Sequence, residues 1–320
     1  MRRPAALVIL GLLGVAARAA APAPPGRGAA APPEPRAAKP AAPGVAETQA
    51  RLNWRANVDA AIREAAATRR VVLLYFRADW CQPCHWMEQG PFASRKMAAY
   101  IEQHFVPLRV DDTAETGPVS KRYEIRVYPS ILCLDGAGVP LHLIVGPREA
   151  EALYGLLEQV RALPGLMAAQ KAAPGDLEAN FAVGNAFAKL DQLRRAAPYL
   201  ERAVELDPDN RRGRKSQAVL MLAVVPLEDG NVGKTLDNLD TYLRVFEGAP
   251  EVPVALHLKG TVLYRDGRLK ESRAVFEELR QKFPKHRMAY EADKAIEAID
   301  ARLRAPPPEA KPPEGGAKKP

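Results

Sequence analysis

Residues 71–84 read VVLLYFRADWCQPC, and this stretch decides the fold. Its first part, residues 71–76, is an unbroken run of β-branched, aromatic and other apolar residues, which predicts a buried strand. Its last part carries two cysteines separated by two residues, and the sequence that follows, up to Met87, predicts a helix. Cys81 and Cys84 therefore lie where a strand passes into a helix.

The place of Cys81 at a predicted helix N-terminus gives the pair a defined chemistry. Unpaired N–H groups and the helix dipole at that end favour thiolate over thiol, so Cys81 becomes a nucleophile near neutral pH. Cys84 lies one turn further on, close enough to close a disulfide and to release a mixed-disulfide partner. We therefore expect Cys81 to attack and Cys84 to resolve.

The sequence on either side alternates between helical and strand patterns. Apolar residues recur at helical spacing in residues 53–68, 94–103 and 148–163. Further strands are predicted at residues 105–110, 130–134 and 140–145, and the turn DGAG joins the last two as a hairpin. Residues 48–163 are therefore predicted to form one α/β domain, with a β-α-β unit and then a β-β-α unit around one sheet.

Residues 71–162 resemble the thioredoxin family. The resemblance rests on the segments ADWCQPC at residues 78–84 and RYEIRVYPS at residues 122–130, and on Gly146. It implies that Pro129 is cis and packs against the disulfide, and that the backbone at Tyr128 pairs with a substrate chain. It also implies that Trp80 belongs to the rim of the active site.

A closer resemblance is to exported thioredoxin-like proteins of the DsbD C-terminal-domain kind. It is carried by CHWME at residues 84–88, by FVPLRVD at residues 105–111, by Phe92 and by the helical pattern that starts at Trp54. It implies a thiol-disulfide oxidoreductase that works through a redox-active Cys81–Cys84 disulfide, with no added cofactor and no metal. The partners it implies are protein substrates that carry thiols or disulfides.

One position departs from the thioredoxin pattern. Tyr75 stands where thioredoxins carry a buried acid that helps to move the proton of the resolving thiol. A tyrosine cannot do this near neutral pH, because its reference pKa is about 10. Asp79 and Glu88, the second of them one helical turn after Cys84, are the nearby carboxylates and the candidates for proton transfer. Whether the pair oxidises, reduces or isomerises stays open.

Other interpretations of the same residues are available. CQPCH at residues 81–85 also fits the attachment pattern of c-type haem with His85 as an axial ligand, but haem leaves Trp80 and the segment around Pro129 unexplained. A zinc site is weaker, because two cysteines and one histidine leave a tetrahedral shell unfilled. Cys133 lies in an apolar strand and is predicted to be a buried small residue, and the alternative is a third redox thiol.

The second half of the chain carries helical repeats. Residues 177–210 place small, aromatic, large and proline residues at the positions typical of a 34-residue tetratricopeptide repeat: Gly184, Phe187, Ala196, Leu200, Ala203 and Pro208. A second unit has matching offsets and ends at Pro284: Leu256, Gly260, Leu263, Ser272, Phe276 and Leu279. A degenerate repeat is expected between them at residues 213–247, and residues 288–303 are expected to form a capping helix.

Residues 174–304 are therefore predicted to form an all-α tetratricopeptide-repeat solenoid. The resemblance to that family implies a concave surface that binds a protein or peptide partner, and the alternative is a domain that only stabilises or spaces the chain. A basic run at residues 211–215 is not accompanied by base-stacking aromatic residues, so nucleic acid is not an expected partner.

The charge and the ends of the chain point to export. The formal charge of the 320-residue chain is +8, but residues 1–47 hold six Lys or Arg against two Asp or Glu, so half of the charge lies there. Arg2 and Arg3, the apolar run at residues 5–17 and the small-x-small site at residues 17–19 predict a signal peptide over residues 1–19. An uncleaved anchor is the alternative, and only in that case do we expect attachment to a membrane.

Residues 20–47 and 305–320 are rich in alanine or proline and poor in large apolar residues, which predicts a disordered tether and a disordered tail. We therefore expect an α/β thioredoxin fold followed by an all-α repeat solenoid, exported to the bacterial periplasm, where a cysteine pair can oxidise. The expected function is thiol-disulfide exchange with a repeat domain that recruits a partner. The alternative is an envelope scaffold whose thioredoxin-like part is mainly structural.

Overall fold

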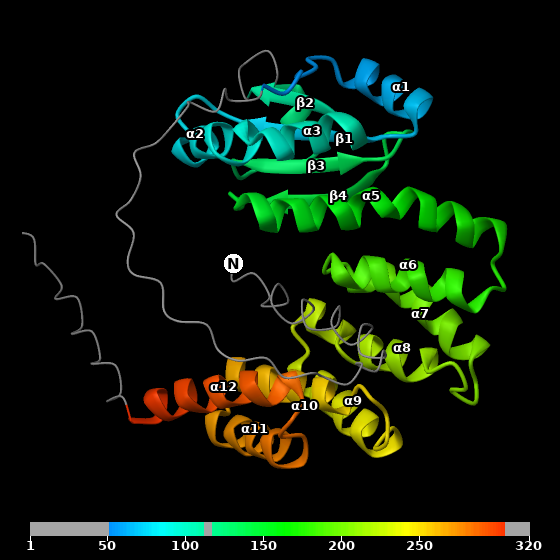
Figure 1. The fold of residues 1–320 in the computed structure, drawn as a ribbon, viewed down its shortest axis with the longest axis vertical. Coiled ribbons are helices and arrows are strands. Elements are labelled where there is room, and N and C mark those ends of the chain that lie inside the picture. Colours follow the sequence, from blue (N-terminus) through cyan, green and yellow to red (C-terminus); the bar gives the residue numbers. More distant parts are fainter. Residues whose placement is uncertain (1–50, 112–116, 305–320) are drawn as a thin grey trace, which may run out of the picture. The chain divides into compact units, whose positions relative to one another are not determined.

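The computed structural model describes residues 51–111 and 117–304 (Figure 1). The predicted signal peptide, tether and tail, at residues 1–19, 20–47 and 305–320, lie outside these residues. The described residues fall into two compact units that divide between Tyr199 and Leu200, inside helix α7 (Leu193–Leu206). The first unit is α/β with a helical end, and the described part of the second is helical.

The first unit is built on a four-stranded sheet in the order β2-β1-β3-β4. Its strands are β1 (Val71–Arg77), β2 (Phe105–Asp111), β3 (Ser130–Leu134) and β4 (Pro140–Val145). β1 pairs with β2 in parallel and with β3 antiparallel, and β3 pairs with β4 antiparallel. All seven residues of β1 are buried, which agrees with the continuous apolar run at residues 71–76, and the seventh is Arg77.

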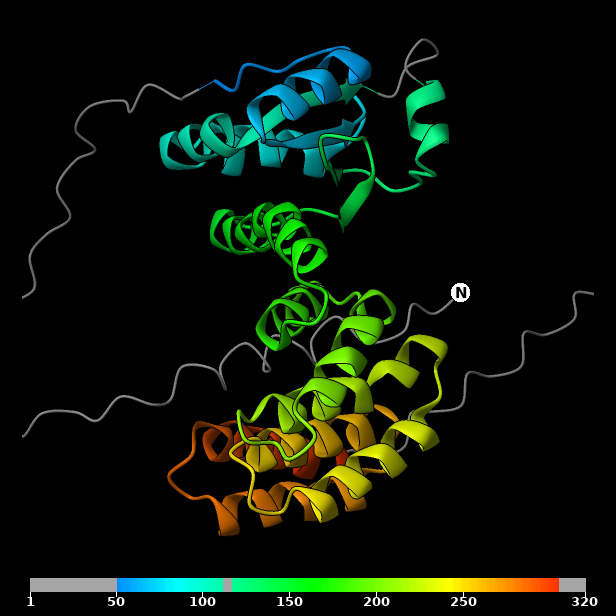
Figure 2. The same cartoon turned by 90° about the vertical axis from the view of Figure 1, so that its right-hand side faces the viewer.

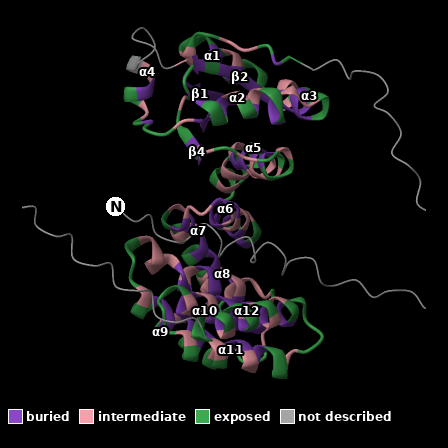
Figure 3. Ribbon diagram, turned by 90° about the vertical axis from the view of Figure 1, so that its left-hand side faces the viewer, coloured by how far each residue is buried: buried purple, intermediate pink, exposed green. Residues whose placement is uncertain are grey.

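Helices cover the sheet from both sides. They are α1 (Val58–Thr68), α2 (Gln82–Gln89), the short η3 (Pro91–Ala93), α3 (Arg95–His104), α4 (Gly117–Arg122) and α5 (Ala150–Ala172). Ala61 and Ala65 of α1 share a buried core with alternate residues of β1, such as Leu74. Figure 3 shows α1 and α5 on opposite sides of β1, with the buried residues between them. This arrangement confirms the predicted β-α-β and β-β-α units.

The first helix begins later than the sequence predicted. Its pattern was expected from residue 53, but α1 begins at Val58, where the Asn57 side chain accepts a hydrogen bond from the Ala60 N–H at 2.8 Å. The residues before it are extended, because the Arg55 backbone pairs with β2: Arg55 N–H donates to the Pro107 carbonyl at 2.9 Å. Edge pairing therefore overrides the helical spacing that starts at Trp54.

Helix α5 also differs from the prediction, which ended a helix at Leu163. It continues through Pro164 to Ala172, although proline cannot donate the usual backbone hydrogen bond. The part before Pro164 buries Leu163 and other apolar residues. The part after it packs against α6 (Leu177–Lys189), where Gln170 Nε2 donates to Asn180 Oδ1 at 3.2 Å. Packing at both ends keeps the helix continuous, so α5 contacts both the sheet domain and α6.

The first helical hairpin, formed by α6 and α7, covers the free edge of β4 with residues from its turn and from the start of α7. Gln192 Nε2 and Arg195 Nη1 donate to the backbone carbonyl of Leu141 at 2.9 and 2.8 Å. Arg195 stacks over the ring of Phe187 at 4.3 Å, which holds its guanidinium in place. An uncovered strand edge presents unpaired backbone groups to other chains, so these contacts protect the sheet as well as dock the hairpin.

The second unit consists, over residues 200–304, of the end of α7 and of helices that stack in sequence. They are α8 (Arg214–Ala223), η4 (Val225–Asp229), α9 (Val232–Val245), α10 (Val252–Arg265), α11 (Leu269–Lys282) and α12 (Arg287–Arg304). Figure 2 shows this stack of helices in colours from yellow-green to red. α12 matches the predicted capping helix. None of the helices in residues 51–111 and 117–304 is both long and apolar enough to cross a membrane.

The close packing of α10 and α11 explains the small residues of the repeat pattern. A side chain at Gly260 would put its Cβ 2.7 Å from the ring of Phe276. Ser272 Oγ donates to the Gly260 carbonyl at 2.8 Å across the same contact. Gly260, Ser272 and Phe276 therefore form one interlocking contact, as their spacing predicted.

His142 on β4 makes the docked edge sensitive to acid. Burial, together with the positive charges of Arg195 and Arg148, lowers the pKa of His142 to about 4, and Gln192 Nε2 donates to its Nδ1 at 2.9 Å. Between about pH 6.5 and pH 4, His142 binds a proton in the unfolded chain but not in the folded chain. The free energy of unfolding should therefore fall as the pH drops through this window, by up to about 3 kcal/mol.

Urea denaturation of the full chain at a series of pH values checks this, with His142→Asn as the comparison. The asparagine keeps a polar group near Gln192 but does not titrate. The variant should lose less stability than the parent as the pH falls. Identical pH profiles for the two proteins would show that His142 does not contribute.

Candidate active site

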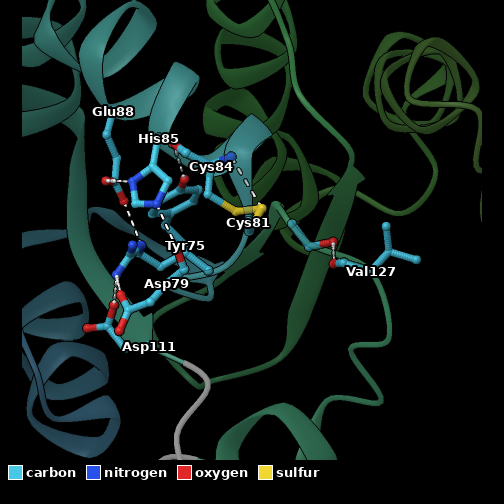
Figure 4. Close-up of a disulfide and its surroundings, with 10 residues drawn as sticks. Tyr75, Asp79, Cys81, Cys84, His85, Glu88, Asp111 and Val127 are labelled. Carbon is cyan, nitrogen blue, oxygen red and sulfur yellow. Dashed lines mark hydrogen bonds and ion pairs between the residues drawn. A yellow bond between two sulfur atoms is a disulfide. The ribbon is translucent and has the colours of Figure 1, made fainter.

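Cys81 and Cys84 are joined in a disulfide at the N-terminus of α2 (Figure 4). The two Cα atoms lie 5.3 Å apart, and both cysteines are buried. Cys81 is the N-cap residue of α2, and the backbone N–H of Cys84 donates to Cys81 Sγ at 3.2 Å. The same N–H also donates to the Cys81 carbonyl at 3.0 Å, and its second contact, with the sulfur, stabilises a thiolate at Cys81 when the bond is reduced.

The local sequence accounts for this placement. β1 ends at Arg77, and the chain turns before α2, with Cys81 N–H donating to the Ala78 carbonyl at 3.1 Å. Pro83 lies in the first turn of α2, where its missing N–H costs no helical hydrogen bond. The strand and the first turn of the helix thus fix the position of both sulfur atoms.

A second loop joins the rim of the site. The Tyr128–Pro129 peptide bond is cis, the isomer that the resemblance implied. The ring of Tyr128 meets that of Trp80 edge to face, with ring centroids 5.9 Å apart, so the residues next to Pro129 and next to Cys81 are in contact. Trp80 is 74% exposed, and Val127, just before Tyr128, is 44% exposed. Exposed apolar side chains therefore flank the disulfide.

Tyr75 is a neutral side chain that contacts α2, the helix that carries the cysteine pair. Its hydroxyl donates to the Cys84 carbonyl at 3.1 Å, and its ring contacts Trp54 and Phe92 with centroids 5.6 and 4.9 Å apart. Burial, and then the negative charge of Glu88, raises the pKa of Tyr75 well above its ordinary value. Tyr75 therefore keeps its proton near neutral pH and anchors α2 rather than exchanging protons with Cys84.

Arg77 is a charged residue of the site that sequence reasoning missed. Its side chain is buried at the end of β1 and contacts three carboxylates: Asp111 at 2.6 Å, Asp79 at 2.8 Å and Glu88 at 2.9 Å. The contact with Glu88, between Nε and Oε1, is an ion pair whose geometry does not meet that of a hydrogen bond. The available signal was a charged residue closing a buried apolar strand, and the parallel register that sets Arg77 opposite Asp111.

Arg77 brings together the two carboxylates proposed for proton transfer, Asp79 and Glu88. The Asp79 side chain is largely exposed, and that of Glu88 is 27% exposed. His85 lies between them: its Nε2 hydrogen-bonds to the Asp79 carbonyl at 2.8 Å and its Nδ1 is 3.9 Å from Glu88 Oε2. Figure 4 shows Glu88, His85 and Asp79 grouped on one flank of the disulfide.

Cys133 is a buried residue of β3, as predicted, and is not bonded to another cysteine. Burial raises the pKa of its thiol to about 12. A thiol that stays protonated is a poor nucleophile, so the geometry does not favour a third redox thiol here. In residues 51–111 and 117–304, no group of three or more histidine, cysteine or acidic residues is placed to hold a metal ion.

Comparison with known proteins agrees with this geometry. Residues 53–147 match a family model described as thioredoxin-like, and residues 177–210 match one described as a tetratricopeptide repeat. The thiol:disulfide interchange protein DsbD of Ralstonia nicotianae (strain ATCC BAA-1114 / GMI1000) is 34% identical over 107 residues, which are 32% of this chain and 17% of that protein. The chain thus covers less than a fifth of the length of this relative.

Two solved structures are also similar. A thioredoxin from Thermus thermophilus is 24% identical and is matched over 38% of this chain and 96% of its own, with a TM-score of 0.34. The oxidised C-terminal domain of DsbD from Neisseria meningitidis is 22% identical over 33% of this chain and 97% of its own, with a TM-score of 0.29. The two family models show that the chain combines a thioredoxin-like domain, which carries the Cys81–Cys84 pair, with a tetratricopeptide-repeat region, as the sequence predicted.

The anchoring role of Tyr75 can be separated from a proton-transfer role. Tyr75→Phe removes the hydrogen bond to the Cys84 carbonyl and should lower the free energy of unfolding by about 1 kcal/mol. Because Tyr75 stays neutral and takes no proton from Cys84, the rate at which the Cys81–Cys84 disulfide re-forms should keep the pH midpoint of the parent. Urea denaturation and the pH dependence of re-oxidation of the reduced protein by a small disulfide measure the two effects, with Tyr154→Phe on α5 as the control. A shifted midpoint with unchanged stability would contradict this role.

The burial of Cys133 predicts selective labelling. In the reduced, folded protein, iodoacetamide at neutral pH should modify Cys81 and leave Cys133 unmodified, because the Cys133 thiol is protonated and inaccessible. Mass spectrometry of the labelled peptides checks this, and labelling in urea, where all three cysteines should react, is the control. Equal labelling of Cys133 and Cys81 in the folded protein would contradict the prediction.

Proposed function

We propose that this protein is an exported thiol-disulfide oxidoreductase that acts on other proteins in the bacterial periplasm. The observation that carries the proposal is the Cys81–Cys84 disulfide at the N-terminus of α2, where the Cys84 N–H points at Cys81 Sγ. Thioredoxin-like domains act on protein thiols, and the similar protein DsbD is named for thiol:disulfide interchange. The predicted signal peptide supports export, and a periplasmic location supports oxidation of the pair.

The exchange runs through a mixed disulfide. In the reduced protein the Cys81 thiolate attacks one sulfur of a substrate disulfide, so that a Cys81–substrate bond forms and the other substrate sulfur leaves as a thiolate and takes up a proton. Cys84, after losing its proton, then attacks Cys81 Sγ. The second substrate sulfur leaves and is protonated, the substrate is reduced by two electrons, and the Cys81–Cys84 bond is re-formed. The reverse sequence oxidises a substrate dithiol.

The rim residues have separate roles in this proposal. Exposed Trp80 and the loop around Pro129 form the groove that receives the substrate chain, and the backbone at Tyr128 pairs with it. The contact between Trp80 and Tyr128 supports this, because it joins the two sides of the groove beside Cys81. Asp79 and Glu88 take up or supply the proton of the Cys84 thiol, directly or through water, since Tyr75 cannot.

The repeat region recruits a protein or peptide partner. Tetratricopeptide repeats generally mediate protein interactions, and residues 177–210 match that family. We propose that this partner is a substrate, or a protein that delivers one, so that recruitment raises the local concentration near the redox pair. The protein is attached to a membrane only if the signal peptide stays uncleaved.

Trapping of mixed disulfides tests the proposed exchange. In full-length Cys84→Ala, Cys81 can still attack but the intermediate cannot be resolved, so covalent complexes should accumulate in periplasmic extracts and disappear on reduction. Gel electrophoresis without reductant, followed by mass spectrometry, identifies the trapped proteins. The matched control is Cys81→Ala with Cys84→Ala, which should trap nothing.

Two outcomes separate oxidoreductase from scaffold. Complexes that depend on Cys81 support the oxidoreductase and name its substrates. If the Cys84→Ala variant yields no covalent complex, while both variants still bind the same partners without covalent bonds, the protein is a scaffold and the proposed exchange is wrong. Cys133→Ala should change neither result, because that thiol is buried.

A further inference from the structure

Arg77 links the elements on both sides of the cysteine motif. Its side chain is 8% exposed, and its guanidinium contacts Asp79 in the turn before Cys81, Glu88 on α2 after Cys84, and Asp111 at the end of β2. A buried arginine is stabilised only when its charge is paired, and here the pairing uses carboxylates from separate elements. Arg77 therefore fixes where negative charge lies around the pair.

The charges of this cluster influence titratable groups at α2. The Tyr75 hydroxyl is 3.1 Å from the Cys84 carbonyl, and its titration responds to the charges around it. Burial is the largest influence, but the negative charge of Glu88 raises the pKa of Tyr75 and the positive charge of Arg77 lowers it. A thiolate at the same helix is also an anion, so the same signs apply to it.

The cluster carries excess negative charge even with Arg77 in place. Its three carboxylates, on Asp79, Glu88 and Asp111, face two guanidinium groups, because Arg109 Nε also contacts Asp111 at 3.2 Å. His85 on α2 adds a titratable group beside Glu88. Without Arg77, Arg109 is the one guanidinium left in this cluster to offset the three carboxylates. The greater net negative charge makes a thiolate at Cys81 less favourable.

We propose that Arg77 is a positioning residue of the redox site: its guanidinium holds three carboxylates beside the Cys81–Cys84 pair and offsets their charge, and so sets how readily Cys81 forms a thiolate. This rests on the proposed function, since it concerns the same pair. Arg77 acts through its positive charge and through the positions of its carboxylate partners. It does not itself form or break a bond in the exchange.

Two substitutions break the same ion pair but change the charge in opposite directions. Arg77→Met removes a positive charge and should raise the pKa of the Cys81 thiol, which slows its alkylation at neutral pH by about tenfold. Asp111→Asn removes a negative charge and should lower that pKa, which speeds alkylation by up to about tenfold. Arg77→Lys keeps the charge and should restore most of the parent rate, although it cannot hold three carboxylates at once.

The measurement is the rate of Cys81 alkylation against pH in the reduced full-length protein, followed by mass spectrometry. Equilibration with glutathione gives a second readout: two glutathione thiols lose two electrons and two protons to form their disulfide, and the Cys81–Cys84 bond is reduced to two thiols. At a pH above the reference thiol pKa of about 8.5, Arg77→Met should make reduction up to about tenfold less favourable, or about 30 mV.

Opposite shifts in Arg77→Met and Asp111→Asn support the proposal. Shifts in the same direction, or no shift in either variant, overturn it, because a merely structural brace is weakened alike by both. If Arg77→Met fails to fold, the other two variants still decide. The proposal then requires faster Cys81 alkylation in Asp111→Asn and a rate near that of the parent in Arg77→Lys. These readouts need only a reducible pair, so they are independent of whether Cys84→Ala traps substrates.

Discussion

The burial of β1 on both faces is the constraint on which the rest of the redox site depends. Because neighbouring strands pair with both of its edges, the backbone of β1 cannot shift without breaking the sheet. The side chain of Tyr75 contacts α2, and that of Arg77 contacts Asp111 of β2. Only four residues separate the end of β1 at Arg77 from the start of α2 at Gln82. The position of the sulfur atoms is therefore set by a strand that is buried on both faces and paired on both edges.

The polar groups of the site are of two kinds: a neutral hydroxyl in the interior and ionised side chains on one flank. Tyr75 fills the interior with an aromatic ring and one hydrogen bond, where an ionised group would pay a large desolvation cost. The ionised groups lie at the strand ends and along α2, where Arg77 pairs with them. Charge therefore influences the cysteines from a part of the site that water still reaches.

Local sequence patterns were sufficient for most of the fold. The apolar runs located the strands, the Cys-x-x-Cys spacing located the start of α2, and the small residues around Gly260 marked a close helix contact. The features that were missed depend on partners far along the chain. Arg77 meets Asp111 only through the parallel register, and α5 passes Pro164 only because packing on both halves offsets the lost hydrogen bond.

The cover that Gln192 and Arg195 provide for β4 bears on where this protein can be divided. A truncation at the end of the sheet domain, near Leu163, would cut α5 in two and leave the carbonyls of Pro140 and Leu141 open at a strand edge. Such an edge recruits strands from other molecules, and the fragment would tend to self-associate. A shortened protein that keeps the sheet intact should therefore retain α5 whole, together with α6 and the Gln192 and Arg195 side chains that cover β4.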